Sequence, residues 1–103
     1  MSFNRSSNRS FIIKANGEII AALPDDEEFS LQQIRDHVAG SPEVICETRD
    51  GFLLFRNKEG VAKGLPTNEL ATSMYINSAQ RARSVVGRVL LAHPDHIPSY
   101  WKR

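Results

Sequence analysis

The sequence has little of several features that would narrow its class. Among 103 residues there is one cysteine, Cys46, so no intramolecular disulfide can form, and we expect it to be a small buried side chain. There is no apolar run of about 18 residues and no apolar signal segment at the N-terminus, so we expect a cytoplasmic protein without a membrane partner. The formal net charge is only +1, so nucleic acid is not an expected partner.

The residues that are present fit a single globular domain. Of the 103 residues, 41% are hydrophobic and 24% are charged, which is enough apolar material for one core. The charges are unevenly distributed, with a net charge of −4 in residues 1–50 and +5 in residues 51–103. The second half can therefore attract an anion, although two unlike halves can equally face each other in the fold.

Two β-hairpins are predicted from pairs of apolar runs. Each pair is separated by a dipeptide that tolerates successive positive φ angles, and these dipeptides are Asn16-Gly17 and Asp50-Gly51. The second arm of the later hairpin, Phe52 to Phe55, is apolar without alternation. That pattern indicates burial on both faces and a position near the centre of the sheet.

Two helices are predicted from capping residues and helical spacing. The first begins at Ser30, where Gln33 completes a capping box, and Gly40 is expected to end it in a left-handed conformation. The second begins after Thr67 or Asn68 as its N-cap. A final strand, SVVGRVLLAH, carries Gly87 inside it, which indicates a bulge or a close backbone approach.

The predicted order is ββαββαβ, an α+β fold with a mostly antiparallel sheet. Helices inserted between hairpins usually cover one face, so we expect two layers, with the other face solvated, covered by the tail or used by a partner such as a second copy. We expect residues 10–92 to form the domain and residues 1–9 to form a flexible leader. We expect residues 93–103 to form a tail across the surface, in which Tyr100 and Trp101 pack against the domain.

Several motifs in order resemble one family. EVICETRDGFLLFRNKEG, KGLPTN and VVGRVLL, together with FIIKANGEII and SLQQIRDHVAG, resemble domain-of-unknown-function family 3846, which is seen in phages, plasmids and bacteria. The resemblance covers roughly residues 10–91. It implies a small α+β fold, often on mobile elements, and brings no catalytic residues. The leader, the basic spacer AQRARS and the segment after Ala92 depart from the family pattern.

The loop from Asn57 to Asn68 is the main candidate binding site. Glycines permit close backbone approach, lysines supply charge, and the following helix N-terminus offers N–H groups to an anion. The candidate ligand-binding residues in and beside it are Arg56, Asn57, Lys58, Lys63, Gly64 and Asn68. The alternative is a connector without ligand: Pro66 directs the chain, Asn68 caps the helix, and Glu69 in the first turn repels an anion.

A basic strip with aromatic neighbours extends this candidate site. Arg81 and Arg83, with Tyr75 nearby, can hold a nucleotide by charge and stacking. The alternative is a solvated basic cluster at the end of the second helix.

Other chemistry finds little support in the sequence. His93, Asp95 and His96 have a spacing that zinc can use, but the sequence offers no second cluster of ligands, and we expect no metal and no cofactor. His37 is expected at the surface of the first helix. No catalytic motif occurs, so we expect no enzyme activity.

Three hypotheses follow. The leading one is a non-enzymatic domain of phage or mobile-element type, with a role against host defence, that sequesters a small anionic, nucleotide-like ligand. The second is a protein-interaction module or homodimeric inhibitor that uses the open sheet face or the C-terminal tail. The third is weak nucleic-acid binding, which the net charge of +1 disfavours.

Overall fold

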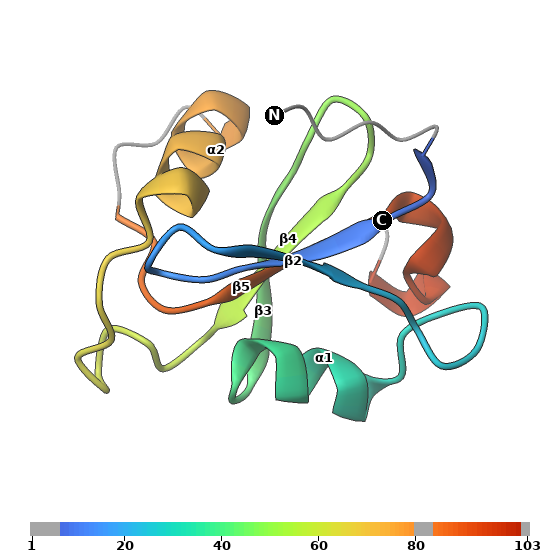
Figure 1. Ribbon diagram of the computed structural model, residues 1–103, viewed down its shortest axis with the longest axis horizontal. Coiled ribbons are helices and arrows are strands. Elements are labelled where there is room, and N and C mark those ends of the chain that lie inside the picture. Colours follow the sequence, from blue (N-terminus) through green and yellow to red (C-terminus); the bar gives the residue numbers. More distant parts are fainter. Residues whose placement is uncertain (1–6, 80–83, 102–103) are drawn as a thin grey trace.

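The computed structural model describes residues 7–79 and 84–101 and contains a five-stranded antiparallel sheet and two α-helices (Figure 1). The predicted ββαββαβ order and the α+β class are confirmed. Two short 3-10 helices follow the last strand. The elements are β1 (Ser10–Ile13), β2 (Ile19–Ala22), α1 (Leu31–Val38), β3 (Pro42–Glu47), β4 (Leu53–Asn57), α2 (Glu69–Ala79), β5 (Val89–Ala92), η2 (Pro94–His96) and η3 (Ser99–Trp101).

The sheet has the strand order β2-β1-β5-β4-β3, so β5 is central and β2 and β3 are the edges. All four residues of β5 are buried, which explains its continuous apolar sequence. The β4 strand lies next to it, as the unbroken apolar run from Phe52 to Phe55 predicts. The strand around Gly87 is shorter than expected, because β5 begins at Val89 and Val86 makes only an isolated bridge to Thr67.

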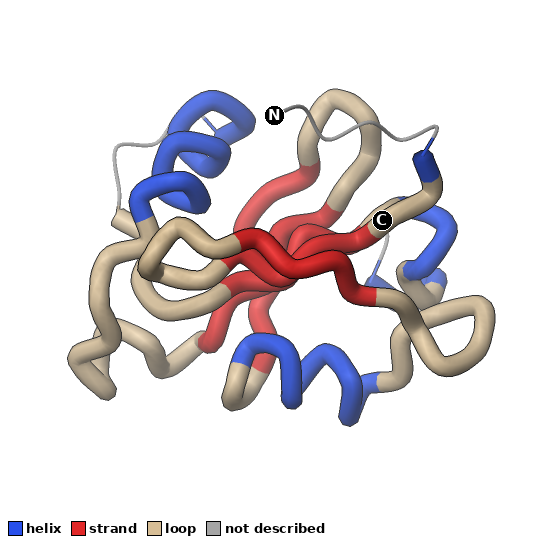
Figure 2. The backbone as a smooth tube through the Cα atoms, viewed as in Figure 1, coloured by secondary structure: helices blue, strands red, loops and turns tan. Residues whose placement is uncertain are grey.

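The two helices cover opposite faces of the sheet, so the domain has three layers and the expectation of two layers was wrong (Figure 2). Leu90 of β5 packs in one hydrophobic cluster with Ile34 of α1. Its neighbour Leu91 packs in the other cluster with Tyr75 of α2. Because consecutive strand residues point to opposite faces, a central strand that is apolar throughout requires a covering layer on each side. The sheet therefore has no fully open face for a partner, and its edges become the surfaces of interest.

The ends of α1 follow the sequence at its start and depart from it at its end. Ser30 and Gln33 form the predicted capping box, with both reciprocal hydrogen bonds present. The left-handed residue at the C-terminus is Ala39, with φ 58°, and not Gly40 as expected. Glycine is required at position 40 for another reason: a Cβ there would lie 2.6 Å from Asn57 Nδ2. Gly40 thus allows the Asn57 side chain to approach the backbone.

The two hairpin turns share one geometry that differs from the expected one. Only the glycine of each dipeptide has a positive φ, 93° at Gly17 and 85° at Gly51. Each glycine N–H donates to a carbonyl three residues earlier, Gly17 to Lys14 and Gly51 to Thr48. This pattern fits a type I turn followed by a left-handed glycine, a common longer hairpin connection.

The segment after β5 belongs to the core and does not lie across the surface. Ile97 is 1% exposed and His93 is 1% exposed, and Phe29 donates its N–H to the carbonyl of His96. Trp101 packs edge-on against Phe55, with ring centroids 5.0 Å apart, on the α1 face of the sheet. Prolines 94 and 98 exclude a strand here, but they are compatible with the short 3-10 turns that return the chain to the core. Within the described ranges, no helix has the length and apolarity needed to cross a membrane.

Candidate functional site

The 57–68 loop is closed at its start by Asn57. This residue is 3% exposed, and its Nδ2 donates to the carbonyl of Ala39 at 3.1 Å. Its Oδ1 accepts the N–H of Glu59 at 2.9 Å. The side chain therefore ties the exit of β4 to the end of α1, and its polar atoms are used within the protein.

Asn68 closes the other end of the loop and is 1% exposed. Its Nδ2 donates to the carbonyls of Ile13 and Gly87, each at 2.9 Å. Its Oδ1 accepts the N–H of Ala71 at 3.1 Å, so Asn68 is the N-cap of α2, as predicted. One side chain thus connects β1, the segment before β5 and the helix start, and none of these atoms points to an open site.

Backbone N–H groups along the loop also have partners inside the protein. Lys58 donates to Ser41, and the later donors stay within the loop: Gly60 to Asn57, Lys63 to Glu59, Gly64 to Val61 and Leu65 to Gly60. An anion-binding loop needs several N–H groups directed at the ligand. The loop instead uses four of these donors for its own turns and the fifth, from Lys58, to bond to Ser41.

Leu65 fills the place where a ligand hollow was expected. A Cβ added at Gly87, which has φ 75°, would lie 2.7 Å from Leu65 Cδ1. A Cβ at Gly60 would lie 3.0 Å from Val86 Cγ2 and 3.5 Å from the same leucine methyl. Glycine at these positions therefore admits the protein's own side chains. Among the described residues, Leu65 therefore occupies the space between Gly60 and Gly87.

Those of the remaining predicted ligand residues that the structure describes do not converge. Arg56 is paired with Glu43 across β3 and β4, with Nε and one terminal nitrogen each 2.8 Å from the same carboxylate oxygen. Lys58, Lys63 and Gly64 are exposed on the outside of the loop. Tyr75 is 6% exposed and packs in the core. Arg81 and Arg83 lie outside the described residues.

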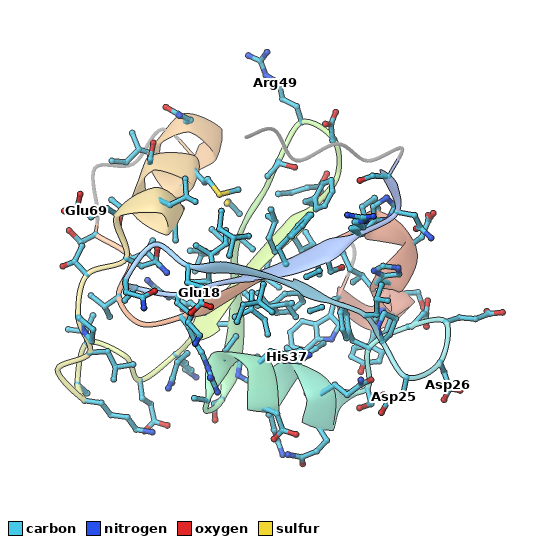
Figure 3. All side chains as sticks on the ribbon, in the orientation of Figure 1. Glu18, Asp25, Asp26, His37, Arg49 and Glu69 are labelled. Carbon is cyan, nitrogen blue, oxygen red and sulfur yellow. The ribbon has the colours of Figure 1, made fainter. Side chains whose placement is uncertain are left out.

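A shallow hollow of about 370 Å³ lies beside α2. It is lined mostly by hydroxyl and amide side chains, namely Thr67, Thr72, Ser73, Asn77 and Ser84, with Ile76 and Glu69. Glu69 is the only charged residue among them, and Figure 3 shows it on the outer side of the helix start. Among the described lining residues the charge is therefore negative, which opposes anion binding.

A buried serine and two histidines join the start of β1 to the C-terminal turns, an arrangement that the sequence analysis missed. Ser10 is fully buried, and its Oγ lies 2.8 Å from Nδ1 of His96. The same Oγ accepts the N–H of His93 at 2.8 Å. Through these two hydrogen bonds, one accepted from the His93 N–H and one shared with the His96 ring, Ser10 fastens the C-terminal segment.

Two of the histidines are shielded from water to different degrees, and this burial lowers the pKa of each. Burial lowers the pKa of His96, and the neighbouring His93 lowers it further. Burial also lowers the pKa of His37, followed by the effect of Arg88, and its ring meets Phe29 edge-on. His37 is half-buried, which corrects its expected surface position, and Figure 3 places it between α1 and the sheet.

The His93, Asp95 and His96 motif stabilises a turn. Nδ1 of His93 accepts the N–H of Asp95 at 3.0 Å, which caps η2. A ring nitrogen that accepts a hydrogen bond carries no proton, so its 3.9 Å approach to the Asp95 carboxylate is not an ion pair. In residues 7–79 and 84–101, no group of three or more His, Cys, Asp and Glu side chains is arranged to hold a metal ion.

The outer edge of β3 carries a hollow of about 470 Å³ that sequence reasoning did not find. It is lined by Val44, Ile45, Cys46, Glu47, Leu53, Tyr100 and Trp101, and we call it the β3 groove. A β-bulge between Val44 and Cys46 places Ile45 and Cys46 both toward the α2 face, whereas Val44 faces α1. The groove therefore crosses the strand edge, and Cys46 is half-buried, lining the groove and packing against the core cluster on the α2 side.

The aromatic end of the groove is open on one side. Tyr100 is 68% exposed, whereas Trp101 is half-buried. Nε1 of Trp101 is buried and has no hydrogen-bond partner among the described residues. Tyr100 also borders a second hollow that contains Asp26, Glu27 and Glu28, so an acidic surface adjoins the β3 groove.

These features define a small α+β domain with an internally braced loop and an open, aromatic-flanked strand edge. Residues 9–98 match the family described as a domain of unknown function (DUF3846), and the chain belongs to this family. The match confirms the resemblance found in the sequence and extends it to residue 98, so the segment after Ala92 is largely part of the family domain. Neither the curated proteins nor the solved structures include a match to this chain.

Proposed function

We propose that this protein is a non-enzymatic interaction domain that holds an extended segment of a partner protein in the β3 groove. The observation that carries the proposal is the position of a 470 Å³ hollow on an edge strand, flanked by two aromatic side chains. An edge strand presents unpaired backbone groups that an added strand can use, and adjacent pockets select its side chains.

The lining of the groove indicates the chemistry of the partner segment. Val44, Ile45 and Trp101 favour an apolar side chain in the partner segment. Glu47 and the acidic surface beyond Tyr100 favour a lysine or arginine next to that apolar residue. Lys102 and Arg103 follow Trp101 in the sequence and lie outside the described residues.

The nucleotide-like ligand suggested by the sequence stays a hypothesis without a site at the 57–68 loop. Thermal-shift titration with cyclic and linear nucleotides tests it, because a ligand at about 100 times its dissociation constant adds roughly 2.7 kcal/mol of stability. The proposal of a partner-binding edge strand instead predicts no stabilisation in that titration. We further propose that the protein acts by sequestering its partner, as a small protein of phage or mobile-element type.

Selection from a random decapeptide library, followed by affinity measurement through the fluorescence of Trp101, tests the proposal. Trp101 is the single tryptophan of the chain and lines the groove, so its emission reports on a peptide bound there. We expect recovered peptides to pair an apolar residue with a basic one, and Tyr100→Ala to weaken them at least tenfold. Val61→Ala is a matched control, since Val61 is 75% exposed and Tyr100 68% exposed. Recovery of no peptide, or equal weakening by both variants, would contradict the proposal.

A further inference from the structure

The second edge of the sheet, β2, differs from β3 in that its residues carry no charge and no bulge. Among the described residues β2 pairs with β1 alone, in a regular register without a bulge. Residues 19–24, Ile-Ile-Ala-Ala-Leu-Pro, carry no charge. Ile20 is 38% exposed and Leu23 is 66% exposed. Natural edge strands are normally protected by charges, prolines or bulges, and within 19–23 this edge has none of them.

We propose that the β2 edge pairs with the β2 edge of a second copy of this chain, which joins two sheets into one of ten strands. Pairing about a two-fold axis perpendicular to the sheet keeps the α1 faces of the two copies on the same side. In such an antiparallel pair, the axis passes midway between one residue and its own copy. With the axis at Ala21, Ile20 lies opposite Ala22 of the second copy and Ile19 lies opposite its Leu23. This register covers the exposed Leu23 with an apolar neighbour.

The charges favour a second copy at β2 and disfavour one at β3. Glu18, the nearest charge before the uncharged stretch, is held by Lys14 at 3.1 Å and would face Pro24 of the second copy. The same symmetry applied to β3, with the axis at Ile45, would place Glu43 opposite Glu47 twice. Like charges directly opposite each other destabilise a strand pair. The β3 strand also has a bulge that interrupts regular pairing.

The β2 dimer is independent of the β3 groove and has a geometric consequence for it. Since β2 and β3 lie at opposite ends of the sheet order, a dimer through β2 leaves the two β3 grooves at the outer ends of the joined sheet. The assembly would then present two identical edges to partners.

The test uses charge at the symmetry axis, with mass measured by sedimentation over a range of protein concentrations. Ala21 is exposed, so Ala21→Lys and Ala21→Glu should fold, which circular dichroism checks. We expect the natural chain to show about twice its 11.6 kDa mass at high concentration, and each variant alone to raise the dimer dissociation constant at least tenfold. Mixing the two variants should restore a dimer by pairing opposite charges. Ala62→Lys, at an exposed alanine of the 57–68 loop, should dimerise like the natural chain.

Three results would overturn this inference. The first is a natural chain that stays at 11.6 kDa at every concentration. The second is an Ala21→Lys variant that dimerises as well as Ala62→Lys, because the interface would then lie elsewhere. The third is a mixture of folded Ala21→Lys and Ala21→Glu chains that remains monomeric, because the two residues would then not face each other.

Discussion

Three single substitutions of Asn68, to alanine, serine and aspartate, separate the structural hydrogen bonds of its side chain from any ligand role. Asn68→Ala removes the cap of α2, which costs about 1 kcal/mol. It also leaves the carbonyls of Ile13 and Gly87 without the donor that now lies 2.9 Å from each. Loss of a buried partner costs about 1 to 3 kcal/mol per group, so the cap and the two carbonyls together give an expected total of roughly 3 to 7 kcal/mol.

The other two variants divide this total. Asn68→Ser keeps a hydroxyl that can cap the helix but cannot reach both carbonyls, so it should recover about 1 kcal/mol relative to Asn68→Ala. Asn68→Asp keeps the cap and the shape, but it directs a carboxylate oxygen at two carbonyl oxygens in a site that is 1% exposed. We expect this variant to be at least as unstable as Asn68→Ala near neutral pH, since a buried charge without a partner is costly.

Urea unfolding followed by circular dichroism measures these differences. A domain of this size has about 5 to 15 kcal/mol of stability in total, so the expected loss moves the midpoint by a large and easily measured amount. If Asn68→Ala lowered the free energy of unfolding by less than about 1 kcal/mol, the hydrogen bonds assigned to this side chain would not brace the loop, and a ligand role would regain support.

Three further predictions rest on other contacts. Burial lowers the pKa of His37 and His96, so the unfolded chain binds protons more readily than the folded chain. The free energy of unfolding should therefore fall as the pH drops below 6.5, as urea titrations at pH 7.5 and 5 can check. Equal stability at the two pH values would contradict this prediction. Gly40→Ala should cost about 1 to 3 kcal/mol, since its Cβ would meet Asn57 Nδ2 at 2.6 Å, and an unchanged melting temperature would refute this reason. Ser10→Ala should cost about 1 to 3 kcal/mol and speed hydrogen exchange at the amide of residue 93, whereas Ser10→Thr, if it packs, should keep that protection.

Local signals in the sequence were sufficient for the helix starts. Ser30 with Gln33, and Asn68 before α2, satisfy N–H groups within three residues of the cap, so neighbours along the chain contain the whole interaction. The class of the fold followed from the order of these elements and the hairpin glycines. What the hairpin dipeptides did not fix was the turn type, because only Gly17 and Gly51 adopt positive φ.

The features that depend on distant residues were not predictable. The apolar sequence of β5 indicates burial on both faces, but it does not say which helix covers each one. The 57–68 loop resembled an anion site because its glycines have two explanations, and the deciding contact, Leu65 against Gly87, joins segments that are separated by a helix. The groove was missed because Pro94 and Pro98 exclude a strand without indicating that the segment returns to the core. Ser10 and His96, which fasten it, lie at opposite ends of the chain.

Chemical-shift mapping of a selected peptide on the isotope-labelled protein tests most directly whether the β3 edge is the binding surface. The account predicts the largest changes at the amides of residues 43–47 and at the indole N–H of Trp101, with the amides of residues 58–65 unchanged. Largest changes within residues 58–65, with the Trp101 indole unaffected, would contradict it and return the site to the loop.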